Sequence, residues 1–543
     1  MEEKEDEEVE TQKEENEGKE QAEEPEEEVE YLDEDVEWIA DEDRPADNSD
    51  ESANEGDVFE EQMDVVQEFT PPQDDTFQLF SGHKESVFCV DFDCTGQYLV
   101  SGGQDHIAII WNVATGVAEF ICQGHEDSVH CVKFSPDGGY LCTGDMAGSI
   151  RVWLKPLKSV ETSLEWKLLT TLNTGDLLWI RWWSPPANSI NVKSKVDNTS
   201  GLPNPAVLLA GDEDGLVTAW PVKANLTNTN SAASHAKCLS GTGQPAIDAI
   251  ILPSTVNTDK PKLAVLYKDG DLRVWDLKTE SQITSLQLCS THSSLSTLCR
   301  DLEVYQLLSP QSFTTSSGGV NSSESDVFLI TGNGFICPVS LKHTPTTEML
   351  DSRLKILDVI KTEDDGSVEA LSCSWTHPLF AFGTVTGILG ICDTQTLSIR
   401  QKWMYIDEDD GQPIGITSLC WSRYKPIFFT TTVKGSIVAW PGISGERIQS
   451  PSLSSPTCNH QSKDPIPLKI WWGHKAMILD LALPPSMHNL SNHNNNVEIN
   501  SEKGNENTLQ LLNNSKTELY NIEPFLCTAS DDATVRFFEI NFS

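Results

Sequence analysis

The chain has 543 residues and a formal net charge of −47. This acidity argues against direct binding of nucleic acid, because phosphate backbones repel an acidic surface, and it favours basic protein partners. No apolar run reaches about 18 residues and the first residues form no apolar signal core, so we expect neither membrane insertion nor secretion. The 14 cysteines include no Cys-x-x-Cys pair and are expected to be reduced. The expected location is the cytoplasm, with the nucleus as an alternative.

Residues 1–75 form a separate acidic segment, with 35 acidic and 4 basic residues and a net charge of −31. Because so few apolar residues cannot offset the entropy lost on ordering, this segment is predicted to be a disordered tail. Two apolar clusters interrupt it, one around Trp38 and one from Phe59 to Phe69. They are interpreted as scattered side chains of a solvated tail, or alternatively as a docking motif or a pseudo-ligand that folds back on the rest of the chain.

From Phe77 onward, short apolar runs bounded by Gly, Asp and Asn recur to the end of the chain, which indicates an all-β domain over residues 76–543. Two stretches align at a shift of 42 residues. One opens on Gly-His at His83 and closes at Trp111, and the other opens at His125 and closes at Trp153. A repeat of this length and pattern is typical of one four-stranded blade of a β-propeller.

The blades can be counted by their third strands, each of which follows a tight turn and ends on an aromatic residue or a substitute. Eight such strands are predicted, ending at Trp111, Trp153, Trp220, Trp275, about Val339, Cys392, Trp440 and Phe538. The pattern is degenerate within residues 280–400, and a seven-bladed ring is the alternative. The last blade lacks a fourth strand, and residues 77–80 are expected to supply it, which would close the ring and hide two sheet edges.

These repeats resemble the WD-repeat family over roughly residues 77–540. The resemblance implies that each blade is held by a hydrogen-bonded set: the His of Gly-His, a Ser or Thr of the second strand, an Asp in the following turn, and the closing Trp. Only blade 1 shows the full His, Asp and Trp combination, because Ala147 replaces the Asp in blade 2, Thr386 in blade 6 and Lys434 in blade 7. The other blades are expected to depend more on apolar packing. The residues assigned to this structural set are His83, Asp105, Trp111, His125, Trp153, Asp214, Trp220, Asp269, Trp275, Trp440, His474 and Asp532.

Within the family, the acidic tail, the run from Phe80 to Val87 and the eight divergent repeats resemble one particular group. The fungal member of that group is a dedicated chaperone for one basic protein of the large ribosomal subunit. Its animal members are linked with cell migration and angiogenesis. The resemblance therefore implies either a chaperone in ribosome biogenesis or a scaffold in signalling.

Blade topology distributes the loops over two faces. The top face carries the loops before each first strand and between second and third strands, and the bottom face carries the others. Five long insertions are predicted on the bottom, at residues 184–205, 225–236, 308–326, 442–467 and 484–523. The top face is therefore expected to be short and uninterrupted, as a docking surface should be.

The predicted top loops are rich in carboxylates, and several Trp residues lie near them in the sequence. Carboxylates would steer and pair with Lys or Arg, and Arg can also stack on Trp, so this face is predicted to capture a basic segment. The alternative is that these loops are merely polar and that Trp residues such as Trp182 and Trp421 belong to the core. The predicted contact residues are Glu85, Glu126, Asp127, Asp145, Asp176, Trp179, Asp212, Glu213, Asp364, Asp365, Asp407, Glu408, Asp409, Asp410 and Trp472.

The sequence lacks a Gly-rich phosphate loop with Lys and lacks Cys and His pairs at zinc spacing, so no cofactor, metal site or catalytic residue is predicted. The predicted function is that of a non-enzymatic scaffold, expected to be monomeric, that captures a basic protein segment. A large-subunit ribosomal protein awaiting assembly is the favoured partner. The alternatives are a signalling scaffold in cell migration and angiogenesis and, from another class, a propeller hydrolase.

Overall fold

The structure is a computed structural model that describes most of the region predicted to be folded. The described residues are 69–156, 165–184, 203–224, 236–252, 261–291, 295, 302–310, 325–345, 350–362, 366–407, 411–443, 464–485 and 525–540. Residues 1–68 lie outside this set, so disorder of the tail stays a prediction, as does the domain boundary at residue 75.

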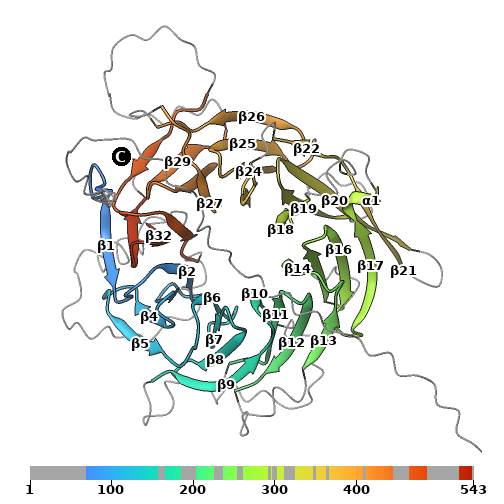
Figure 1. The fold of residues 1–543 in the computed structure, drawn as a ribbon, viewed down its shortest axis with the longest axis horizontal. Coiled ribbons are helices and arrows are strands. Elements are labelled where there is room, and N and C mark those ends of the chain that lie inside the picture. Colours follow the sequence, from blue (N-terminus) through green and yellow to red (C-terminus); the bar gives the residue numbers. More distant parts are fainter. Residues whose placement is uncertain are drawn as a thin grey trace, which may run out of the picture. The chain divides into compact units, whose positions relative to one another are not determined.

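The described strands form eight antiparallel sheets that follow one another around a central axis (Figure 1). The innermost strands of neighbouring sheets contact each other in sequence, and the innermost strand of the last sheet contacts that of the first. The chain is therefore an eight-bladed β-propeller. This confirms the predicted fold class, including the fifth and sixth blades, whose sequence pattern is degenerate.

The first four blades each contain four consecutive strands. Blade 1 contains β2 (Val87–Phe92), β3 (Tyr98–Gly103), β4 (Ala108–Asn112) and β5 (Ala118–Cys122). Blade 2 contains β6 (Val129–Phe134), β7 (Tyr140–Asp145), β8 (Ser149–Leu154) and β9 (Lys167–Asn173). Blade 3 contains β10 (Leu177–Trp183), β11 (Ala206–Asp212), β12 (Leu216–Val222) and β13 (Lys237–Ser240). Blade 4 contains β14 (Ala246–Leu252), β15 (Lys262–Tyr267), β16 (Asp271–Asp276) and β17 (Ser281–Gln287), and the short helix α1 (Leu288–Thr291) follows it.

The last four blades include one five-stranded sheet and the sheet that closes the ring. Blade 5 contains β18 (Val304–Leu308), β19 (Ser325–Gly332), β20 (Phe335–Pro345) and β21 (Leu350–Ile356), and β22 (Ile360–Lys361) also pairs with β20. Blade 6 contains β23 (Ala370–Cys373), β24 (Leu379–Gly383), β25 (Ile388–Asp393) and β26 (Ile399–Met404). Blade 7 contains β27 (Ile416–Trp421), β28 (Ile427–Thr432), β29 (Ile437–Pro441) and β30 (Lys469–Trp471). Blade 8 contains β31 (Ile478–Ala482), β32 (Phe525–Ser530), β33 (Thr534–Glu539) and β1 (Thr76–Ser81).

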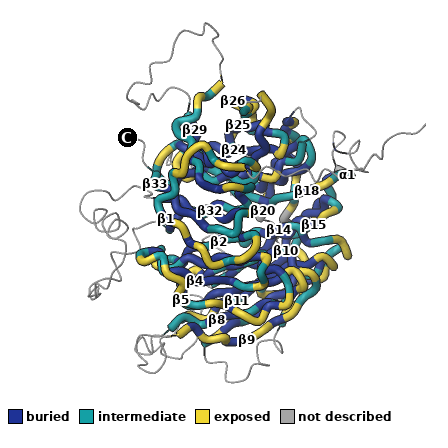
Figure 2. Tube along the Cα trace, turned by 60° about the vertical axis from the view of Figure 1, so that its left-hand side comes forward, coloured by how far each residue is buried: buried dark blue, intermediate teal, exposed yellow. Residues whose placement is uncertain are grey.

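Burial differs between the inner and outer strands of a blade. Every residue of β7, β28 and β32 is buried, because the second strand is covered on both faces by neighbouring blades. The fourth strands β5, β9 and β13 expose about half or more of their residues, and they form much of the exposed outer surface in Figure 2. The second strands are therefore enclosed over their whole length, whereas the fourth strands face solvent.

Among the described residues, the apolar core is divided into eight clusters, and each cluster combines residues from two neighbouring blades. Blades 8 and 1 share one cluster, as do blades 1 and 2, and so on around the ring. A blade taken alone would expose both of its buried faces. The ring is thus stabilised blade against blade, and its closure covers the two faces that would otherwise remain open.

Closure is made by β1, as the sequence predicts. This strand pairs antiparallel with β33, with Ser81 opposite Thr534 and Phe80 opposite Val535. The Phe80 side chain is 1% exposed and its ring centroid lies 4.6 Å from that of Phe537. Phe69, the first described residue, belongs to the predicted tail and contacts the propeller, because its ring lies 6.1 Å from that of Trp472. The remaining apolar residues of the two predicted tail clusters lie outside the described residues.

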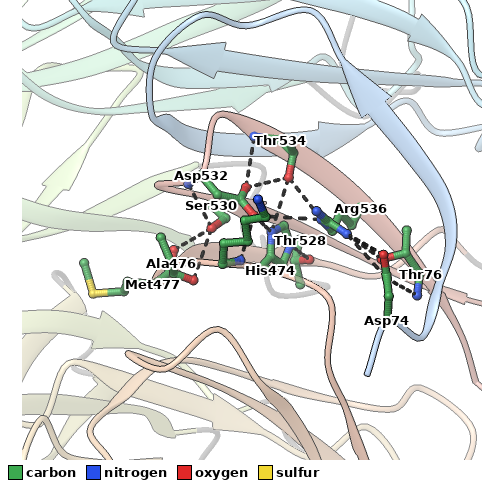
Figure 3. A network of polar contacts seen from close by, with 11 residues as sticks. Asp74, Thr76, His474, Ala476, Met477, Thr528, Ser530, Asp532, Thr534 and Arg536 are labelled. Atoms are coloured by element: carbon green, nitrogen blue, oxygen red, sulfur yellow. Dashed lines mark hydrogen bonds and ion pairs between the residues drawn. The ribbon is translucent and has the colours of Figure 1, made fainter. Parts of the chain in front are cut away.

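A polar clasp reinforces the closing strand (Figure 3). The Arg536 guanidinium, 7% exposed, donates a hydrogen bond of 2.9 Å to the Thr76 hydroxyl and lies 3.4 Å from each carboxylate oxygen of Asp74. Its Nε atom donates to the Thr534 hydroxyl at 3.2 Å. The clasp therefore joins the residues at the start of β1 to Thr534 and Arg536 of β33.

We expect Phe80→Ala to lower the free energy of unfolding by about 3–5 kcal/mol, because it leaves a cavity in the cluster that blades 8 and 1 share. Leu79→Ala in the same strand is the matched control, since the Leu79 side chain is 48% exposed, and should change it by less than about 0.5 kcal/mol. Urea unfolding followed by tryptophan fluorescence measures both. Equal effects of the two substitutions would contradict closure through the buried face of β1.

Candidate binding face

One backbone hydrogen bond recurs at the top of every blade. The residue that follows the second strand donates its N–H to a carbonyl just ahead of the first strand, with distances of 2.8–3.3 Å. Blade 6 deviates slightly, since its donor is one residue further along. The donors, here called the top ring, are Gln104, Met146, Glu213, Lys268, Asn333, Val385, Val433 and Asp531. Because the same bond fixes all eight, these residues occupy equivalent places around the axis on the top face.

Exposed carboxylates gather on the top connections of blades 1–3. Glu85, Glu126, Asp176 and Glu213 are exposed, and Asp127 is half-buried with its carboxylate accepting from the Ser128 N–H at 2.6 Å. Asp214 is exposed beside Glu213. We call these six residues the acidic sector. Among the described top connections of these three blades, Lys84 is the only Lys or Arg. Arg151 of β8 also reaches the connection of blade 2, where its guanidinium donates to the Gly124 carbonyl. The sector still carries a net negative charge.

Asp145 and Asp212, both predicted to contact a partner, are buried and serve the framework. Asp145 is 0% exposed and its carboxylate lies 2.9 Å from His125 Nδ1. Asp212 is 1% exposed and accepts from the Thr174 hydroxyl at 2.7 Å and from the Leu216 N–H at 2.8 Å. The prediction of partner contact is corrected for both, because a carboxylate enclosed by its own blade cannot reach a bound segment.

The His, Ser or Thr, Asp and Trp set is complete in blade 1 and also in blade 2. In blade 1, His83 lies 2.9 Å from an Asp105 oxygen and 2.8 Å from the Ser101 hydroxyl, which also accepts from the Trp111 indole at 2.8 Å.

In blade 2, the Thr143 hydroxyl lies 2.8 Å from His125 Nε2 and accepts from the Trp153 indole at 3.0 Å. Asp145 completes this set in place of the turn residue Ala147. The expectation that blade 2 lacks the set is therefore wrong.

Other blades keep parts of the set. In blade 8, His474 lies 3.0 Å from Asp532 and 2.8 Å from the Thr528 hydroxyl, with Phe538 in the place of Trp. In blade 7, the Trp440 indole donates to the Thr430 hydroxyl at 2.9 Å.

Blades 3 and 4 depart further from the predicted set. Trp220 and Trp275 are buried as core residues. Asp269 is half-buried and accepts from the Asp271 N–H at 3.1 Å. Asp214 is exposed rather than part of the blade 3 framework, so its predicted structural role is corrected.

The tryptophans predicted to stack on a bound Arg have other roles. Trp179 is 3% exposed in the core between blades 3 and 4, and its indole N–H donates to the Ala246 carbonyl at 2.8 Å. Trp472 is half-buried, and its backbone bonds to Asp75 at 2.8 and 2.9 Å. Trp182 and Trp421 are also core residues. Stacking of a partner on Trp179 is therefore corrected, because its ring is enclosed between two blades.

The long insertions connect the strand pairs expected from the prediction. In strand order, 184–205, 225–236, 308–326, 442–467 and 484–523 fall between first and second or between third and fourth strands, and most of their residues lie outside the described ones. The top face is nevertheless not uninterrupted, because the connection from β17 to β18 contains helix α1. Asp407 forms an ion pair with Lys434, whereas Asp364, Asp365, Glu408, Asp409 and Asp410 lie outside the described residues.

Comparison with known proteins agrees with this fold. Residues 75–112 and 116–153 match the family described as WD domain, G-beta repeat. The first two blades thus match the WD-repeat family, and the described strands form a propeller. It is 28% identical over 413 residues to angio-associated migratory cell protein of Homo sapiens, covering 76% of each chain, and 27% identical to that of Canis lupus familiaris. The resemblance to a particular group within the family is thus confirmed.

Two solved structures share the architecture. The Saccharomyces cerevisiae Sqt1 matches with a TM-score of 0.57 at 17% identity, covering 86% of this chain and 99% of that one. The Chaetomium thermophilum Sqt1 bound to the N-terminus of the ribosomal protein L10 matches with a TM-score of 0.58 at 16% identity, covering 86% and 100%. At these identities the likeness establishes the fold alone.

Among the described residues, no group of three or more His, Cys, Asp or Glu side chains could hold a metal ion. No helix in the described part of the chain is long and apolar enough to cross a membrane.

Asp212→Ala should lower the free energy of unfolding by about 1–3 kcal/mol, because it removes the acceptor for the Thr174 hydroxyl and the Leu216 N–H in a buried turn. Asp214→Ala, two residues away and exposed, should change it by less than about 0.5 kcal/mol. Chemical denaturation of the two variants side by side measures the difference. A larger loss for Asp214→Ala than for Asp212→Ala would support the roles predicted from the sequence, which are a structural role for Asp214 and partner contact for Asp212.

The stability of the fold should also decrease as the pH is lowered below neutrality. Burial lowers the pKa of His125 and His474 from 6.5 in the folded chain, although Asp145 and Asp532 favour the charged form. The unfolded chain binds protons at these residues below about pH 6.5 and the folded chain resists doing so, so stability is present above that pH and is lost as pH falls.

We therefore expect the free energy of unfolding to decrease from pH 7 to pH 5, and His474→Gln should make this decrease shallower. Replacement of the exposed Gln123 by Asn, which removes no titratable group, is the control and should leave the slope unchanged. Urea titrations at pH 7, 6 and 5 give the three slopes. Indistinguishable slopes for the wild type and His474→Gln would refute the contribution of the buried imidazole.

Proposed function

We propose that this chain is a non-enzymatic scaffold whose top face captures a basic protein segment, as a chaperone for a large-subunit ribosomal protein. The observation that carries the proposal is the acidic sector: six carboxylates on neighbouring connections of blades 1–3, with Lys84 as the only base among them. Charges gathered on one face raise the local concentration of a cationic partner and speed its association.

The fold likeness supports the choice of partner. The Chaetomium thermophilum Sqt1 was solved with the N-terminus of the ribosomal protein L10 bound to it, and it aligns with 86% of this chain. We propose that the corresponding basic segment of L10 binds here. A newly made ribosomal protein is basic and needs its charge shielded from nucleic acid until assembly, which an acidic face can provide. Such a chaperone would act in the cytoplasm, where the protein is synthesised, or accompany it to the nucleus.

The fold and the composition of the acidic sector support the non-enzymatic part of the proposal. WD-repeat propellers generally act as binding scaffolds, and the exposed side chains of the acidic sector are carboxylates that project from turns. A role as a signalling scaffold is the second candidate, because the chain is similar to angio-associated migratory cell protein. The chaperone and the signalling scaffold differ in their partners and in the salt dependence of binding, since a contact made by exposed charges weakens as salt screens it.

The double variant Glu213→Lys/Asp214→Lys tests the face directly. Binding of a synthetic peptide with the sequence of the N-terminal L10 segment should weaken at least about tenfold, because two attractive charges become repulsive. The matched control is Glu119→Lys/Glu165→Lys, which changes the net charge equally but alters exposed residues of β5 and of the bottom connection from β8 to β9. Isothermal titration calorimetry at low and physiological salt gives the affinities.

The control variant should bind within about twofold of the wild type, and the wild-type affinity should fall as salt rises. Equal weakening by both variants would show that only the net charge of the chain matters, and would reject the top face as the site. Mass spectrometry of copurifying proteins separates the two candidate functions. A single basic ribosomal protein lost at high salt supports the chaperone, whereas several salt-resistant non-ribosomal partners would reject it.

A further inference from the structure

The top face has a second sector that exposes apolar side chains, in a connection whose sequence also carries acidic residues from Asp407 to Asp410. Two residues of the top ring, Val385 in blade 6 and Val433 in blade 7, are each 43% exposed. Ile406, in the connection from β26 to β27 between these blades, is 46% exposed, and Pro413 in the same connection is exposed. We call these four residues the apolar sector.

The four residues are held together by bonds between three turns. Val433 donates its N–H to the Gly415 carbonyl, and a Cβ built on Gly415 would lie 3.2 Å from a Val433 methyl carbon and 2.5 Å from the Val385 carbonyl oxygen. Ile406 and Pro413 form a β-bridge, and the neighbouring Asp407 pairs with Lys434. The sector is therefore one surface built across blades 6 and 7.

Single exposed apolar residues are ordinary on protein surfaces, so the argument rests on position. The top ring is fixed by backbone hydrogen bonds, and five of its eight residues are polar or charged, as is usual for turns: Gln104, Glu213, Lys268, Asn333 and Asp531. The two β-branched residues stand in adjacent blades and flank a third exposed β-branched residue, Ile406. Nothing in the fold of these turns requires an apolar side chain in any of the three positions.

The arrangement around the axis relates the two sectors. The apolar sector occupies blades 6 and 7, the acidic sector occupies blades 1–3, and blade 8 separates them with Asp531 in the top ring. Asp531 is exposed and accepts a hydrogen bond from the Ser86 hydroxyl of the next turn, which links blade 8 to blade 1. A segment lying across the top face would meet carboxylates over one part of its length and apolar side chains over the other.

Building on the proposed function, we propose that the captured segment is amphipathic along its length. Its Lys or Arg residues lie over the acidic sector, and one or two large apolar side chains next to them lie on Val385, Ile406 and Val433. The occupant is a basic partner rather than the tail of this chain, because residues 1–75 carry a charge of −31 and would be repelled by the adjacent carboxylates. Charge then provides rapid association, and apolar burial provides affinity that salt does not remove.

Two synthetic peptides of equal charge test this specificity. Each has 12 residues with six Arg, and the remaining positions are all Ser in the first peptide and include two adjacent Leu at one end in the second. The wild-type chain should bind the Leu peptide about tenfold more tightly, which is the effect expected for partial burial of two Leu side chains. Fluorescence anisotropy with labelled peptides measures the ratio.

The full-length variant Val385→Ser/Val433→Ser should lose the preference for Leu while still binding the Ser peptide as the wild type does. The control Val117→Ser/Ile121→Ser alters residues that are 60% and 42% exposed at the outer strand of blade 1, and it should keep the preference. Glu213→Lys/Asp214→Lys should weaken both peptides equally. This pattern across the three variants would support the inference.

The failures are distinguishable. If neither peptide binds the wild type, the proposed function fails. If both bind equally, or if the preference survives Val385→Ser/Val433→Ser, the apolar sector is not part of the site and this inference is overturned while capture by charge stands. A preference that appears only after Trp38 and Phe59 of the tail are replaced by Ser would make the tail the resident occupant, and would overturn the assignment to a partner.

Discussion

The structure depends on the sharing of every core cluster between two blades. No blade encloses its own apolar residues, so each buried face is stabilised only when its neighbour is present. An open row of eight blades would leave two faces uncovered, and β1 prevents this by completing blade 8 and packing Phe80 against blade 1. Stability is thus a property of the closed ring, and the polar clasp at Arg536 acts at the seam where closure takes place.

Buried polar groups impose a second constraint on the top face. A buried imidazole or carboxylate must be paired, and in blades 1, 2 and 8 each supplies a partner for the other. The same Asp also accepts backbone N–H groups, as when Asp105 accepts from Lys84 and Asp532 accepts from Lys475, so the carboxylate fixes the turn ahead of the first strand. Acidic residues on this face therefore divide into enclosed ones that shape the turns and exposed ones that remain available to a partner.

The sequence predicts the fold well because the repeat is periodic. The Gly-His and Trp spacing identifies blades 1 and 2, and the count of third strands extends to eight even where the pattern is degenerate. The first strands also carry a β-bulge after their first residue in seven blades, as between Val87 and Cys89, and sequence reading gives no sign of it because the apolar pattern continues through it.

The site was predicted less well, since burial at the end of a strand cannot be deduced from residue type. Asp145 and Asp214 illustrate the difficulty: both are acidic residues near the same turn of a blade, yet the first is enclosed and the second is exposed. A comparison between blades could have identified which carboxylate pairs with the buried His. In blade 1, Gly103 ends the second strand, and a Cβ there would lie 2.7 Å from His83 Nδ1, so the carboxylate must come from Asp105. In blade 2 the equivalent strand end is Asp145 itself, which leaves the turn position free for Ala147.

The top ring explains how one fold can present such different surfaces. Its geometry comes from a hydrogen bond between backbone atoms, so the side chain at each position is not needed to hold the turn. Blade packing and the buried polar sets lie below the ring and are insensitive to whether the exposed residue is Glu213, Lys268 or Val433. The side chains of the ring can therefore vary from blade to blade while the backbone hydrogen bond is kept, which leaves the exposed ones open to selection by a bound partner.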